Sequence, residues 1–155
     1  MSKIYKNTSS RLASIQMLYS FATSEDKEPH DEEEALNEEA LMKRMLEYKA
    51  LRSSKECNID DEKPNKRFVL NLIQSTIKDS LKINTTIEQS LDKPESLKHI
   101  DILTLSILRC AISELIHFET PYKVVIKEYV KIASTFFKDS EVSFINGVLD
   151  KVAKL

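Results

Sequence analysis

The stretch Phe144-Ile145-Asn146-Gly147-Val148-Leu149-Asp150-Lys151 carries the clearest fold signal of the chain. Its apolar residues recur at spacings of one, three and four, which indicates a helix with one buried face. It also holds the only glycine among 155 residues. A glycine inside a helix costs about 1 kcal/mol relative to alanine. Either a neighbouring helix or a ligand is therefore expected to come too close for a Cβ.

Helical periodicity extends from this stretch through most of the chain. Residues 100–117 are apolar on nearly every side, which is typical of a central, buried helix. Thr120 is the predicted N-cap of the next helix, with Pro121 at its first position, and Ser140 is the predicted cap of the last one. The remaining predicted helices cover 9–23, 31–52 and 65–91, the last with a kink near residue 80. The sequence predicts an all-α fold.

Length and composition fit a single domain over residues 1–155, with an acidic insert around 25–64. No apolar run approaches the 18 or more residues of a membrane helix, and the N-terminus lacks the apolar segment of a secretory signal. Cys57 and Cys110 are isolated and show no metal-ligand spacing. A reduced, cytoplasmic setting fits best.

The net charge of −2 conceals an uneven distribution. Residues 25–62 carry a local charge of −8, whereas the rest of the chain carries +6. Residues 1–24 hold three basic side chains and no carboxylate. This distribution fits an anionic partner such as nucleic acid, and equally a solvated N-terminal arm.

Residue arithmetic argues against most chemistries. One glycine cannot build a phosphate-binding GxxxxGK[ST] loop or a GxGxxG turn. The three histidines show no paired-ligand spacing, and nothing resembles a nucleophile elbow. We therefore expect a protein that is not an enzyme, with no catalytic residue, no cofactor and no metal.

The C-terminal third resembles the NusB family of transcription antitermination factors. The resemblance rests on Thr120-Pro121-Tyr122-Lys123-Val124-Val125-Ile126-Lys127-Glu128-Tyr129-Val130-Lys131-Ile132-Ala133 followed by the stretch at 144–151. Residues 107–115 and 15–20 match in order. The middle of the chain, from about 25 to 95, matches only in helical character and is longer than usual for the family.

The resemblance implies two small helical bundles packed perpendicular to each other, in six to seven helices. It also implies a bacterial, non-catalytic factor that assembles with RNA polymerase on ribosomal RNA operons. Members of the family pair with NusE, a ribosomal small-subunit protein, and bind single-stranded boxA RNA. The sequence leaves open whether this chain is a monomer or a homodimer.

Single-stranded RNA is held by cations on phosphates, aromatic rings stacked on bases and amides that bond base edges. Phe144 can supply such a ring and Asn146 such an amide, although a core phenylalanine and a capping asparagine are the alternatives. With the resemblance, the RNA-binding candidates are Lys6, Arg11, Arg109, Lys123, Phe144, Asn146 and Lys151.

Arg109 and Tyr19 each have an alternative interpretation, and Thr104 is a further candidate. Arg109 lies in the most apolar helix, so its guanidinium either contacts RNA or pairs with Glu128. Tyr19 and Thr104 are the candidate contacts to NusE. For Tyr19, the alternative is a tyrosine at the boundary of the core.

The chain departs from the family in one respect. Relatives typically carry an arginine cluster before the first helix, whereas this sequence reads Lys6-Asn7-Thr8-Ser9-Ser10-Arg11. With fewer cations, RNA affinity and its salt dependence should both be smaller. Two other functions stay open: a protein-binding adaptor without RNA contact, and a detached N-terminal domain of a ribosomal RNA cytosine methyltransferase.

Overall fold

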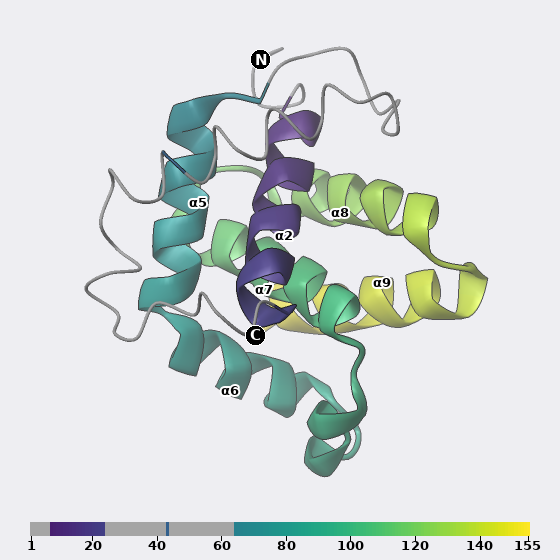
Figure 1. Ribbon diagram of the computed structural model, residues 1–155. Helices are drawn as coiled ribbons and strands as arrows, with labels where there is room; N and C mark the ends of the chain where they lie inside the picture. Colours follow the sequence, from purple (N-terminus) through teal and green to yellow (C-terminus); the bar gives the residue numbers. More distant parts are fainter. Residues whose placement is uncertain (1–6, 24–42, 44–63) are drawn as a thin grey trace. The chain divides into compact units, whose positions relative to one another are not determined.

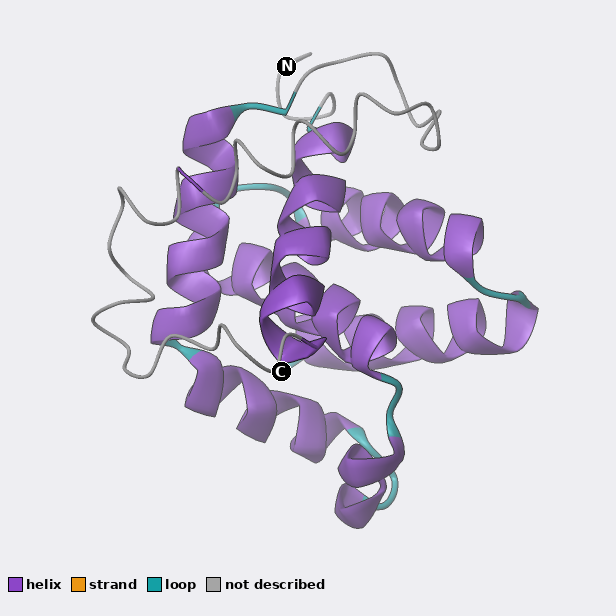
Figure 2. Cartoon of the chain, viewed as in Figure 1, coloured by secondary structure: helices purple, strands orange, loops and turns teal. Residues whose placement is uncertain are grey.

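The computed structural model describes residues 7–23, 43 and 64–155, and the regular elements among them are all helical (Figures 1 and 2). This confirms the predicted all-α fold. In chain order the elements are α2 (Thr8–Thr23), α5 (Lys66–Lys78), α6 (Ser80–Ser90), the 3₁₀ helix η1 (Pro94–His99), α7 (Ile102–His117), α8 (Tyr122–Phe136) and α9 (Asp139–Ala153).

The structure does not describe all of the segments for which the sequence predicts a conformation. The expected helix over 31–52 and the expected connector over 53–64 lie outside the described residues, apart from Lys43 and Pro64. The acidic insert is for the same reason a prediction that the structure does not test.

The chain divides into two compact units, Met1–Lys78 and Asp79–Leu155. In the described part of the first, α2 packs against α5. The backbone N–H of Asn65 donates to Ser10 Oγ at 2.8 Å, which ties the start of α5 to the start of α2. The apolar side chains buried in these two helices are Leu12, Ala13, Ile15, Met17, Leu18, Phe21, Val69, Leu70, Leu72 and Ile73.

In the second unit α7 packs against α6, α8 and α9. Its sequence is apolar on nearly every side, and the helix is correspondingly buried over most of its length. Tyr129 of α8 is fully buried in this core, and its hydroxyl donates to the Glu114 carboxylate at 2.9 Å. This bond satisfies two polar groups that would otherwise be costly to bury.

The predicted kink in the third helical stretch is present. Asp79, with φ −103° and ψ 23°, separates α5 from α6. Leu91 then leaves the helical conformation and η1 follows, with Pro94 in its first turn.

Both predicted N-caps in the C-terminal third are displaced. Pro121, rather than Thr120, is the N-cap of α8. Lys138 is the N-cap of α9, and Ser140 lies within the first turn, where its hydroxyl donates to Glu141. Asp139 and Glu141 place negative charge at that end of the helix, which favours its dipole without a side-chain cap.

The periodicity of residues 9–23 predicts an apolar stripe of Leu12, Ile15, Leu18, Tyr19 and Ala22, and this prediction is wrong for two of them. Tyr19 and Ala22 are exposed, whereas every residue from Thr8 to Ile15 is buried. Periodicity predicts one buried face, and it fails for a helix that is covered on all sides along its first half. None of the described helices is long and apolar enough to cross a membrane.

Candidate functional site

The outer face of α9 is open around its single glycine. Gly147 is exposed, and a Cβ built on it would meet no atom within 4 Å. Among the described residues, no neighbouring helix comes close enough to require a glycine at this position. The other explanation, the approach of a molecule from outside, stays a prediction.

Phe144 and Asn146 lie on opposite sides of this bare stretch of helix. Residues two apart on an α-helix point about 200° away from each other, so the two side chains flank Gly147. The Phe144 ring is 39% exposed, and the core position between them belongs to Ile145. The alternative of a core phenylalanine at position 144 is therefore not supported.

Asn146 is exposed in the middle of α9, so it is not a helix cap. Among the described residues, no hydrogen bond engages its side-chain amide. An aromatic face and a free amide thus border exposed backbone, and both groups are available to a ligand.

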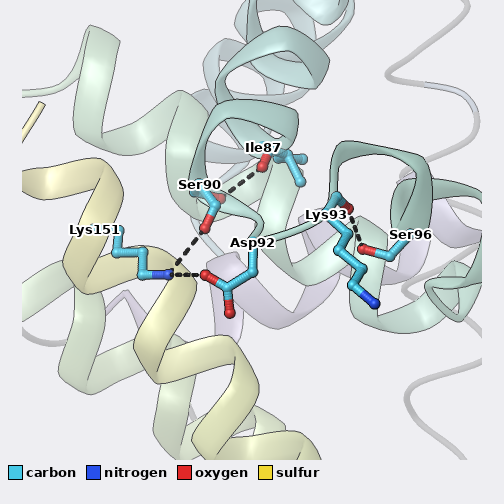
Figure 3. Close-up of polar contacts among 6 residues, drawn as sticks. All are labelled: Ile87, Ser90, Asp92, Lys93, Ser96 and Lys151. Atoms are coloured by element: carbon cyan, nitrogen blue, oxygen red, sulfur yellow. Dashed lines mark hydrogen bonds and ion pairs between the residues drawn. The ribbon is translucent and has the colours of Figure 1, made fainter.

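Lys151 lies one turn beyond Gly147 and contacts the end of α6 (Figure 3). Its ammonium donates to the Ser90 carbonyl oxygen at 3.3 Å and to Asp92 at 3.2 Å. Both ionic partners are well exposed, and such pairs contribute little to stability. The lysine therefore keeps a cation near the open face at small cost to the fold if the pair opens.

Arg109 on α7 is half-buried, and burial lowers the pKa of its guanidinium. Its Nε finds no hydrogen-bond partner among the described residues. The ion pairs between described residues are His117–Asp79, Lys151–Asp92 and Lys154–Asp150, so the expected Arg109–Glu128 pair is absent from them. Arg109 is therefore a half-buried cation whose Nε–H could donate a hydrogen bond to an anionic or carbonyl ligand.

The candidate residues of the N-terminal unit differ from those of α9 in their exposure. The Arg11 side chain is fully buried, with its guanidinium 5.4 Å from the centre of the Phe68 ring. This contact is a cation–π interaction, and it withdraws the charge from the surface. Lys6 lies outside the described residues. Tyr19 is 40% exposed, which leaves its ring accessible to a partner.

Thr104, the other candidate contact to a partner protein, is only 5% exposed on α7. Its backbone N–H donates to the Asp101 carboxylate, which caps the helix. Lys123 is exposed in the first turn of α8. Two more lysines on that helix, Lys127 and Lys131, are exposed and were not among the predicted candidates, although their recurrence at steps of four residues after Lys123 was a visible signal.

The site thus gathers on the second unit. Phe144, Asn146 and Lys151 share α9, while Lys123 and Arg109 lie on the two helices that pack against it. Cys110, next to Arg109, is buried, and burial raises the pKa of its thiol, which disfavours the reactive thiolate form. No group of three or more histidine, cysteine or acidic side chains able to hold a metal occurs in the described ranges.

Comparison with known proteins gives consistent matches over nearly the whole chain. The NusB family model matches residues 8–154. A transcription antitermination protein NusB from Bartonella tribocorum is 30% identical over 151 residues, which cover 96% of this chain and 88% of the relative. Its counterpart from Rickettsia massiliae is 30% identical over 159 residues, covering 98% and 94%.

The fold is also that of a solved NusB. The structure of NusB from T. maritima superposes with a TM-score of 0.70, covering 96% of this chain and 90% of that one, at 24% sequence identity. The family match over residues 8–154 and the curated relatives therefore lead to one conclusion: the chain belongs to the NusB family.

Proposed function

We propose that this protein is a transcription antitermination factor that binds boxA RNA together with NusE and helps RNA polymerase resist termination. Family membership and the names of the relatives, transcription antitermination proteins, support the antitermination role. The observation that supports RNA contact is the open face of α9, where exposed Phe144 and Asn146 flank a glycine with free space beside it. The role is recognition, with no reaction catalysed.

Each group on this face suits a different part of an RNA strand. The Phe144 ring offers a stacking surface, and stacking contributes about 1–3 kcal/mol per base. The Asn146 amide can both donate to and accept from a base edge. Bare backbone at Gly147 lets the strand approach between them, and Lys151 supplies a cation for a phosphate.

The proposed contacts to NusE are Tyr19 on α2 and Thr104 on α7. Tyr19 keeps an exposed ring on α2, and a phenol at an interface can bury its ring while its hydroxyl stays hydrogen-bonded. Thr104 is a weaker proposal because its side chain is buried in the described conformation.

RNA binding by Phe144→Ala and Asn146→Ala tests the proposal. Using a single-stranded boxA RNA with and without NusE, we expect each variant to weaken binding by about tenfold, the loss of one stack or one amide contact. Phe136→Ala and Asn71→Ala are matched controls, because both side chains are exposed on other helices. They should leave RNA affinity unchanged.

A different result would favour the adaptor function. If NusE binds the wild-type protein but no RNA is retained by the protein or the complex, the protein is a protein-binding adaptor. Equal losses in the α9 variants and their controls would remove the assignment of the RNA site to α9.

A further inference from the structure

The outward face of α8 carries three lysines in a row. Lys123, Lys127 and Lys131 recur every four residues and are all exposed. Four residues advance a helix by about 6 Å and rotate it by only about 40°. The three side chains therefore form one stripe, which we call the α8 lysine stripe.

The stripe points away from the core of its unit. The buried positions of α8 are Val125, Glu128, Tyr129, Ile132 and Ala133. Lys127 is two residues from Tyr129, which places it about 200° around the helix from that fully buried ring. The packing of α8 on α7 and α9 consequently leaves all three ammonium groups in solvent.

No carboxylate neutralises the stripe from its own helix. Glu128 is the only acidic residue of α8, and it is 8% exposed. None of the three lysines takes part in the ion pairs or side-chain hydrogen bonds between described residues. Like charges at i and i+4 disfavour a helix slightly, so three of them without an acidic partner have a cost that the fold alone does not explain.

Spacing and charge together identify the ligand. A row of cations at steps of about 6 Å along one helix face suits a polyanionic strand, because single-stranded nucleic acid is held where positive charge follows its backbone. We infer that the α8 lysine stripe is a binding track for the phosphate backbone of single-stranded RNA. This inference rests on the proposed function and extends its RNA site from α9 onto α8.

The stripe and the face around Gly147 lie on two helices that pack against each other. α8 and α9 are joined by the short turn at Phe137 and Lys138 and pack along each other (Figure 1). Lys131 and Phe144 lie equally far along the chain from that turn. A strand whose base stacks on Phe144 can therefore place its next phosphates over α8.

Phosphate contacts carry no sequence information, so the stripe should add affinity for any RNA. The test compares Lys127→Gln/Lys131→Gln with the control Lys82→Gln/Lys98→Gln, which removes the same charge from exposed positions of α6 and η1. Binding of boxA RNA and of a scrambled RNA of equal length is measured against salt, with and without NusE.

We expect the stripe variant to lose about tenfold in affinity for both RNAs near 0.1 M salt and to lower the slope of log affinity against log salt by about 1.4. The control should change neither quantity. Lys127→Arg/Lys131→Arg keeps the charge and should restore both, while melting temperatures show that all variants fold.

Two results would overturn the inferred role of the α8 lysine stripe without affecting the proposed function. In one, the wild type binds boxA RNA and the stripe variant behaves as the control does. In the other, the stripe variant loses NusE binding with unchanged RNA affinity, which would make the stripe a site for an acidic protein surface. If the wild type binds no RNA with or without NusE, the proposed function falls and the stripe with it.

Discussion

At the residue scale, neither helix propensity nor packing against the described residues explains a glycine at position 147. Alanine there would gain helix propensity and would meet no neighbouring atom. Glycine at this position therefore lowers the stability of the helix and leaves an exposed surface without a side chain. Natural sequences depart from local structural preference mainly at functional positions.

Gly147→Ala should accordingly stabilise the fold and weaken its RNA contact. We expect a gain of about 1 kcal/mol in the free energy of unfolding, or roughly 2–4 °C in melting temperature. RNA affinity in the NusE complex should fall, because a methyl group fills the space between Phe144 and Asn146. A lower melting temperature would instead assign the glycine to the fold.

Arg109 is a second residue at which a substitution should change RNA affinity without lowering the stability of the fold. Burial lowers the pKa of its guanidinium, so the charged form is disfavoured by the fold, and at neutral pH the group is nevertheless protonated. Replacing it with the uncharged Arg109→Met should leave the melting temperature unchanged or raise it, and should reduce RNA affinity. Thermal melts and RNA titrations of the same samples check this. A clear loss of stability would show that the guanidinium is a structural group.

At the element scale, α7 is the helix around which the second unit is built. Its N-cap Asp101 accepts hydrogen bonds from the backbone N–H groups of Leu103 and Thr104 at 3.1 and 3.2 Å. These two bonds fix the start of a helix that contacts three others in its unit.

Asp101→Ala should destabilise the protein by about 1 kcal/mol, the usual effect of removing an N-cap side chain. Asp101→Asn keeps an acceptor and should recover most of that loss. Chemical denaturation gives both numbers. Since Asp101 lies outside the proposed RNA face, the affinity of the folded alanine variant for RNA should match wild type, and a specific RNA defect would contradict the placement of that face.

At the scale of the whole molecule, the cations proposed to contact RNA are unevenly available. Arg11 is buried in the first unit, whereas the exposed lysines of α8 and α9 lie in the second. Arg11, one of the three basic residues in 1–24, is therefore not available at the surface.

We therefore predict weak RNA binding by the protein alone and strong dependence on NusE. Titrating boxA RNA at physiological salt should give measurable affinity only in the complex, because few phosphate contacts leave a small electrostatic contribution. Tight binding by the isolated protein at that salt concentration would contradict this expectation.

Deletion of residues 25–62 tests a related prediction, that the acidic segment orients the RNA by repulsion. Unchanged RNA affinity and an unchanged slope of log affinity against log salt would count against it.

The all-α class, the starts of α7, α8 and α9 to within two residues, the break near Asp79 and the family could all be predicted from the amino-acid sequence. These features follow from periodicity, turn residues and local motifs, which act between neighbours in the chain. Four features could not be predicted in this way: Gly147 faces open space, Arg11 is buried over Phe68, Arg109 does not pair with Glu128, and Thr104 is covered. Burial and pairing depend on which helices pack together, and that packing brings together residues far apart in the sequence.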